Sequence, residues 1–147
     1  VMTAVDGYSA ECERTYVTGR PSTEKRDVFA YMMEARRIAM ERIRPGVSCS
    51  EVDAVAREFL VNQGHGGRIL HRTGHGIGLD VHEWAYLVQG DTTPLAPGMC
   101  FSNEPMICIY GEFGVRIEDH FYMTEDGPRW FTEPSHSVDD PFRGVPD

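Results

Sequence analysis

The sequence predicts an α+β fold in which two helices are followed by a run of short strands. Apolar residues recur at helical spacing in two stretches, residues 23–44 and 49–63. From residue 65 onward the chain is rich in glycine and proline, with short apolar stretches between turn signals, as is typical of strands. An Asp-Gly pair near the N-terminus predicts a β-hairpin before the first helix.

The predicted hairpin spans Val1 to Gly19 and turns at Asp6-Gly7. Its return strand is expected over residues 8–17, where alternate side chains face opposite sides. One of those two faces, which includes Ser9, Glu11, Glu13 and Thr15, is unusually polar for a strand.

Each predicted helix has recognisable ends. Ser22 or Thr23 is a suitable N-cap for the first helix, which is expected to end near Arg44, before a Pro-Gly pair. The second helix follows a capping box at residues 48–51, and Gly64 is suited to its C-terminal cap.

Strands are predicted in the second half of the chain, separated by Pro-Gly and Asp-Gly turns. We expect residues 1–132 to belong to one domain and residues 133–147, which are rich in proline, aspartate and serine, to form an irregular tail. The expected strands lie near Gly74–Leu79, Met99–Glu104, Met106–Ile109 and Val115–Met123.

Composition excludes several classes of function. A net charge of −9, carried by interspersed charges, argues against a nucleic-acid-binding protein. No stretch approaches the roughly 18 apolar residues of a membrane-spanning helix, so no membrane partner is expected. Four cysteines without a CxxC pair predict free thiols in a reducing compartment, and the expected location is therefore cytoplasmic.

Four segments concentrate side chains that bind divalent cations. A site with one imidazole, several carboxylates and no thiolate suits Mn, Co, Fe or Zn, and two neighbouring ions need bridging carboxylates. Each residue alone is more often structural, so the prediction depends on their order and context. They are Glu11 in GYSAECERT, His75 in HRTGHGIGLDVHE, Glu104 in SNEP and Glu118 in GVRIED.

The segments GHGIGLDVHE, NEP and VRIED, in this order, resemble metallopeptidase family M24. That family includes aminopeptidase P, prolidase, methionine aminopeptidase and their relative creatinase. The similarity extends from about Val5 to Gly127, and the spacing of His71, His75 and His82 resembles the aminopeptidase P and prolidase branch most. The resemblance implies a pita-bread fold, in which two pseudo-symmetric α/β halves enclose a dinuclear metal site in a curved antiparallel sheet.

The resemblance also assigns roles to individual residues. His71 and His82 match histidines that contact substrate and stabilise the transition state, although His82 could instead bond to backbone at a strand end. Arg116 matches an arginine beside the final glutamate, where it would orient Glu118 or bind a substrate carboxylate. Glu104 is expected to accept the proton of the attacking water as well. The residues that match metal ligands are Glu11, His75, Glu104 and Glu118.

Two departures from the family pattern affect the expected cofactor. Glu11 stands where the family has an aspartate, within a Glu-x-Glu-Arg-Thr variant that creatinase shares, so two, one or no metal ions are compatible with it. The family's first aspartate ligand would fall at or before Val1. We therefore expect residues 1–132 to be the C-terminal portion of a catalytic domain, comprising its second half and the closing hairpin of the first. The chain would then be a fragment, a nicked product or one piece of a longer protein.

The resulting functional hypothesis is an Xaa-Pro peptidase or dipeptidase that cleaves the bond before proline with a metal-bridging hydroxide. One alternative is a creatinase-like hydrolase that splits the C–N bond of a small amide or amidine. The other is a catalytically inactive pita-bread binding module, against which His75, Glu104 and Glu118 argue. We expect a homodimer of the full-length protein, and little activity from this chain without the missing N-terminal half.

Overall fold

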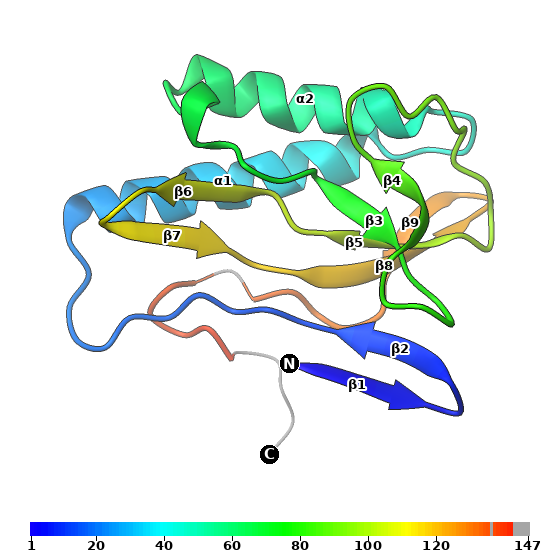
Figure 1. Ribbon diagram of the computed structural model, residues 1–147, viewed down its shortest axis with the longest axis horizontal. Coiled ribbons are helices and arrows are strands. Elements are labelled where there is room, and N and C mark those ends of the chain that lie inside the picture. The colour runs from blue at the N-terminus through cyan, green and yellow to red at the C-terminus, as the bar shows by residue number, and fades with distance from the viewer. Residues whose placement is uncertain (136, 143–147) are drawn as a thin grey trace.

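The computed structural model describes residues 1–135 and 137–142. Two helices lie on one side of the sheets, and a two-stranded hairpin lies on the other side (Figure 1). The helices are α1 (Thr23–Arg42) and α2 (Cys49–Asn62), followed by a 3-10 turn at Gly66–Arg68. The strands are β1 (Met2–Val5), β2 (Tyr8–Glu11), β3 (Gly74–Gly76), β4 (Glu83–Leu87), β5 (Cys100–Asn103), β6 (Met106–Ile109), β7 (Phe113–Arg116), β8 (Asp119–Thr124) and β9 (Gly127–Trp130).

All strand pairs are antiparallel, and the predicted α+β class is confirmed. The main sheet has the order β4-β3-β5-β8-β9, while β1 pairs with β2 and β6 pairs with β7. Strands β3, β5 and β8 are consecutive in the sheet although they are distant in sequence. This arrangement brings three parts of the chain to one place.

The N-terminal hairpin is confirmed, but its return strand is shorter than predicted. Strand β2 ends at Glu11 instead of residue 17, because the following chain leaves β1 and runs beside the segment that enters β8. The backbones of Glu13 and Glu118 exchange two hydrogen bonds there, with N···O distances of 3.2 and 3.0 Å. The segment after β2 is therefore attached to the main sheet.

Both helices have the predicted N-terminal signals. The Ser22 hydroxyl accepts a hydrogen bond from the backbone N–H of Lys25, and Ser48 and Glu51 form the reciprocal capping box of α2. Gly64, with φ of 83°, follows the C-cap of α2 in the left-handed conformation that glycine adopts without strain. No helix among the described residues combines the length and apolar character needed to cross a bilayer.

The strand predictions needed three corrections. The stretch predicted near 74–79 ends as a strand at Gly76, and β4 and β9 were not predicted. The stretch predicted over 115–123 is divided at residues 117–118, where the chain passes from β7 in one sheet to β8 in another. A change of sheet leaves the alternation of side chains almost intact, so the sequence pattern alone does not reveal it.

The predicted tail is described only in part, since residues 136 and 143–147 lie outside the described residues. The described tail residues are irregular, and Asp139 pairs with Arg26 of α1 at an N···O distance of 2.6 Å. A domain boundary at residue 132 stays a prediction.

The main sheet has an apolar face toward the helices and a polar face on which the candidate site lies. Phe101 and Phe121 are directly paired across β5 and β8, and their rings stack with centroids 5.8 Å apart. Ser102 and His120 form the next pair in the register. Because side chains alternate along a strand, this second pair lies on the opposite face from the two phenylalanines.

Glycines allow β3 to lie very close to its neighbours. A Cβ atom on Gly74 would lie 2.1 Å from the carbonyl oxygen of Ser102, and one on Gly76 would lie 2.7 Å from that of Glu83. Both distances are far below van der Waals contact with backbone atoms that cannot rotate away. The glycines on either side of His75 therefore allow the backbone at His75 to lie closer to β4 and β5 than residues with a Cβ atom would.

We predict that Gly74→Ala destabilises the protein by about 1–3 kcal/mol, because the added methyl group forces β3 and β5 apart. Chemical denaturation would measure the change. Gly67→Ala is the matched control, since no described atom lies within 4 Å of its added Cβ. Equal unfolding free energies for the two variants would contradict the proposed close approach.

Candidate metal centre

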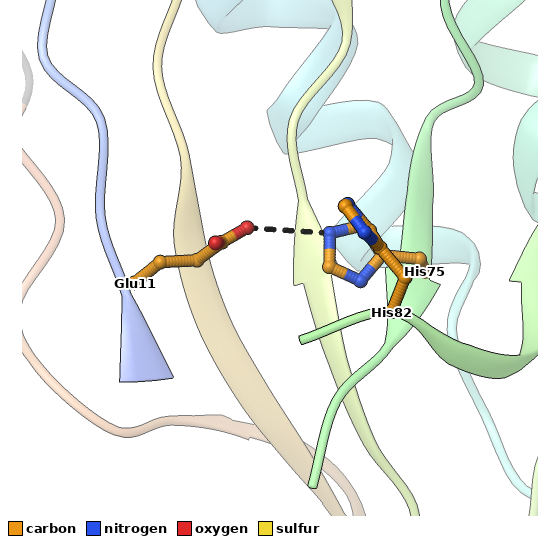
Figure 2. Close-up of side chains that lie close together, drawn as sticks. All are labelled: Glu11, His75 and His82. Atoms are coloured by element: carbon orange, nitrogen blue, oxygen red, sulfur yellow. Dashed lines mark ion pairs between the residues drawn. The ribbon is translucent and has the colours of Figure 1, made fainter. Parts of the chain in front are cut away.

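Three carboxylates from separate segments surround the ring nitrogen Nε2 of His75. This nitrogen lies 3.0 Å from Glu104 Oε1, 3.5 Å from Glu11 Oε1 and 3.7 Å from Glu118 Oε1. Figure 2 shows Glu11 extending from the end of β2 toward the His75 ring. The structure thus brings together the four residues that the sequence predicted as metal ligands.

The His75 ring is oriented with one nitrogen toward backbone and the other toward the carboxylates. Its Nδ1 lies 2.9 Å from the carbonyl oxygen of Gly76, so the ring proton of a neutral imidazole belongs on Nδ1. The lone pair of Nε2 then points at the carboxylate oxygens. Among the described residues, neither this nitrogen nor Glu118 Oε1 has a hydrogen-bond partner, although both are buried.

A divalent cation fits this arrangement. Buried polar atoms are nearly always hydrogen-bonded or bound to an ion, and a lone pair facing several carboxylates is repulsive unless a positive charge lies between them. In the described part of the chain, three groups of side chains each place their ligand atoms within 4.8 Å of one another. They are His75 with Glu104 and Glu118, Glu11 with His75 and His82, and Glu11 with Glu118 and His120.

The pKa values of these groups reflect the same crowding of negative charge. Burial acts to lower the pKa of His75, but its interactions with Glu104 and Glu118 outweigh burial and raise that pKa to about 9. Burial, reinforced by the neighbouring Glu118, raises the pKa of Glu11 to about 7. Burial also acts to raise the pKa of Glu118, but interactions with His120, His75 and Glu11 outweigh it and lower that pKa. Glu11, His75, Glu104 and Glu118 are called the cluster from here on. Without a cation, protons partly neutralise its negative charge.

Both oxygens of Glu104 are held by neighbouring side chains. Oε1 accepts a hydrogen bond from Ser102 Oγ at 3.2 Å, and Oε2 accepts one from Arg116 Nη1 at 3.3 Å. Arg116 also donates to the carboxylate of Glu13. The described hydrogen bonds of the Arg116 side chain therefore go to Glu104 and Glu13, and none goes to Glu118.

The two predicted substrate-contacting histidines lie near different members of the cluster. His71 Nδ1 is 3.7 Å from Glu104 Oε2 and 2.9 Å from the carbonyl oxygen of Arg72. The exposed His82 ring meets the His75 ring edge-on (Figure 2). The two ring centroids are 4.3 Å apart. Burial, together with the positive charges of His75 and Arg72, lowers the pKa of His82.

Sequence reasoning missed His120, which contacts Glu118, and Glu13, which contacts Arg116. His120 Nε2 lies 3.5 Å from Glu118 Oε1, and the Glu13 carboxylate pairs with Arg116. The sequence offers a weak signal for His120, because residues 116, 118 and 120 follow one another at the two-residue period of any extended chain.

A buried ion network supports the segment that carries Glu118. Asp119 accepts hydrogen bonds of 2.5 Å from both Arg14 and Arg36, one on each carboxylate oxygen. Arg36 belongs to α1 and also donates to the carbonyl oxygen of Asn103 at 3.3 Å. The network fixes β8 against the helix and against the chain that follows β2.

A second buried carboxylate anchors the start of β3. Asp53 of α2 accepts hydrogen bonds from the backbone N–H and the hydroxyl of Thr73, at 3.1 and 2.8 Å. The carbonyl oxygen of Thr73 accepts a hydrogen bond from the N–H of Glu104 at 2.8 Å. Thr73 therefore sets the relative position of His75 and Glu104.

A cleft of about 870 Å³ opens beside the cluster. Its walls are largely apolar, and they include the exposed rings of Tyr8, Trp84 and Phe131. Glu11 and His120 are among its lining residues, so the cleft reaches one side of the carboxylate cluster. A small molecule in the cleft could contact the cluster from that side.

Comparison with known proteins identifies relatives of the chain. Residues 1–125 match metallopeptidase family M24. The chain is 45% identical over 127 residues to an Xaa-Pro dipeptidase of Lactobacillus helveticus, a match that covers 86% of this chain and 34% of that protein. The chain therefore spans about a third of the length of the curated relatives that it matches.

Solved structures of relatives confirm the expected pita-bread fold. The crystal structure of dipeptidase PepE from Mycobacterium ulcerans is similar with a TM-score of 0.87 and 42% identity, covering 90% of this chain and 36% of that chain. The prolidase from Pyrococcus furiosus is similar with a TM-score of 0.89 and 36% identity, covering 92% of this chain and 40% of that chain.

We predict that divalent cation binding releases about one to two protons at pH 7. His75, with a pKa of about 9, is largely protonated at pH 7, and Glu11, with a pKa of about 7, is about half protonated. A cation that binds to both residues must displace these protons. The metal-free state binds more protons than the metal-bound state, so affinity rises as the pH rises toward about 9. Calorimetry with Mn²⁺ in buffers of different ionisation enthalpy measures the release, which His75→Ala should reduce. Tight binding without proton release at pH 7 would contradict the prediction.

Proposed function

Because the chain belongs to metallopeptidase family M24, we propose that it forms the metal-binding part of an Xaa-Pro peptidase or dipeptidase. The main support is the convergence of Glu11, Glu104 and Glu118 on Nε2 of His75. Relatives named as Xaa-Pro dipeptidases indicate the substrate class. Since the chain spans about a third of those relatives, the proposal concerns the activity of the whole protein.

We propose two divalent cations, drawn from Mn, Co, Fe and Zn, as the cofactors. The proposed ligands are His75, Glu11, Glu104 and Glu118, which are imidazole and carboxylate groups suited to these metals. Bound divalent cations lower the pKa of water to near neutral and so supply a hydroxide nucleophile at physiological pH.

Glu104 is the proposed proton carrier. Ser102 and Arg116 each hold one of its oxygens, so the carboxylate has a fixed direction at the edge of the cluster. From that position it can accept a proton from the attacking water and pass it to the leaving nitrogen. In this scheme Arg116 is a positioning residue for Glu104.

His71 and His82 are proposed to contact the substrate. The lowered pKa of His82 keeps its ring neutral near pH 7. The N–H of this neutral ring can donate a hydrogen bond to a substrate carbonyl. His71 lies near Glu104 and can donate to the same developing negative charge. We further propose a homodimeric, cytoplasmic full-length protein whose catalytic domain includes residues 1–132.

A creatinase-like hydrolase is the second candidate function, favoured by one observation. Glu13, which belongs to the Glu-x-Glu-Arg-Thr variant, already pairs with Arg116. Arg116 is therefore engaged and is less available to bind the carboxylate of a dipeptide. A small cationic amidine substrate would not require a free arginine at this position.

We predict that Glu104→Gln in the gene-encoded protein lowers kcat for an Xaa-Pro dipeptide by about 10²–10⁴-fold, because the amide cannot carry the proton. Glu112→Gln is the matched control, since Glu112 is exposed in the turn between β6 and β7. Hydrolysis of the dipeptide measured by amine release gives the rates. Activity that persists after complete removal of metal ions would refute a metallopeptidase. Hydrolysis of a small amidine that lacks a carboxylate, instead of dipeptides, would select the second candidate.

A further inference from the structure

We infer that His120 is a metal ligand, and that with Glu11 and Glu118 it forms a second cation position beside the one built on His75. The inference rests on the proposed metal centre and adds a ligand to it. The ring nitrogen of His120 and one carboxylate oxygen from each of Glu11 and Glu118 lie within 4.8 Å of one another. One imidazole and two carboxylates are a suitable ligand set for a divalent cation.

His120 is buried without the hydrogen bond that a structural histidine would have. Its exposed fraction is 7%, and Nε2 has no hydrogen-bond partner among the described residues. Burying such a polar atom is unfavourable unless another group or an ion satisfies it. The nearest carboxylate oxygen, Glu118 Oε1, also lacks a hydrogen-bond partner there.

The register of the sheet directs His120 toward the cluster. His120 pairs directly with Ser102 across β5 and β8, so their side chains lie on one face. Ser102 Oγ in turn accepts a hydrogen bond from the N–H of His75 at 3.0 Å and donates to Glu104. The side chains of His75, Ser102 and His120 therefore come from three adjacent strands on the same polar face.

Glu118 is placed to be shared by the two positions. Its Oε1 lies 3.7 Å from His75 Nε2 and 3.5 Å from His120 Nε2. Neither imidazole nitrogen has a hydrogen-bond partner among the described residues, so neither donates to this oxygen. Glu118 would therefore be shared, with His75 and Glu104 at one position and His120 and Glu11 at the other, although Glu11 also lies 3.5 Å from His75 Nε2.

The two positions differ in access to solvent. His75 and Glu104 are fully or almost fully buried, whereas Glu11 and His120 line the cleft. In the described residues, a cation held by Glu11 and His120 would border the cleft, while one held by His75 and Glu104 would be enclosed. We expect the His120 position to fill second and to lose its ion first.

Cobalt titration of the gene-encoded protein tests the inference. The wild type should bind two equivalents of Co²⁺, as measured by calorimetry and by visible absorption. In His120→Ala the first equivalent should bind as in the wild type, and affinity for the second should fall at least 10–100-fold, which is the loss typical even for residues that only support a ligand. His65→Ala is the matched control, because His65 is buried against Tyr31 and Arg68, away from the cluster.

The outcomes separate this inference from the proposed function. Unchanged affinity for two equivalents in His120→Ala, or a wild type that binds a single equivalent, would overturn the role of His120 and leave the proposed peptidase in place. A wild type that binds no Co²⁺ would overturn both.

X-ray absorption of the wild-type protein with two equivalents of Co²⁺ counts the imidazole ligands directly. This measurement needs no variant, so a misfolded variant cannot affect it. About one imidazole per cobalt is expected if His75 and His120 each bind an ion, and about half that if His75 alone does. His120→Gln, which keeps a polar side chain of similar size, should lower the imidazole count. An unchanged count would exclude His120 as a ligand.

Discussion

Repulsion among the carboxylates of Glu11, Glu104 and Glu118 is the constraint on which the rest of the site depends. Two unit charges about 4 Å apart interact by about 4 kcal/mol at an effective dielectric constant of about 20. Three such groups around one imidazole are therefore strongly unfavourable unless positive charge compensates them. In the metal-free protein, protons supply this charge, which is why the pKa of His75 rises to about 9 and that of Glu11 to about 7.

Positive side chains outside the cluster hold it together without entering it. Arg116 contacts the outer oxygen of Glu104, while Arg14 and Arg36 neutralise Asp119, next to Glu118 in the chain. Buried ion pairs are weak evidence of overall stability, but breaking one leaves an uncompensated charge. Their value here is geometric, since they allow one arrangement of the segment that carries Glu118 and leave the centre of the cluster to a cation.

The parts of the fold that follow local rules could be predicted from the sequence, and the parts set by distant contacts could not. The capping box at residues 48–51 and the Asp6-Gly7 turn are local signals, and both were confirmed. Strand β4 was missed because it has only five residues and no turn signal of the Asp-Gly or Pro-Gly type directly before it, and β9 because a proline at position 128 argues against a strand.

The candidate site shows the same division. The family resemblance indicated that Glu11, His75, Glu104 and Glu118 belong together, but no local pattern gives the distance between β2 and β3. Arg116 was expected beside Glu118, whereas Glu13, from the segment after β2, and Glu104 hold it. His120 lies on the same two-residue period as Arg116 and Glu118, but every extended chain has this period, so the pattern alone does not identify a ligand.

The β1–β2 hairpin is mostly exposed to solvent, and it supplies one member of the cluster, Glu11. A hydrogen bond of 2.7 Å from Ser9 N to Gly78 O joins the hairpin to the chain that follows β3. Glu11 is the hairpin's contribution to the cluster, and its carboxylate lines the cleft and lies 3.5 Å from His75 Nε2. A cation bound by Glu11 and Glu118 would tie β2 to the segment leading into β8, so part of the binding free energy is used to order the hairpin. Metal affinity and the order of the hairpin are therefore coupled through one carboxylate.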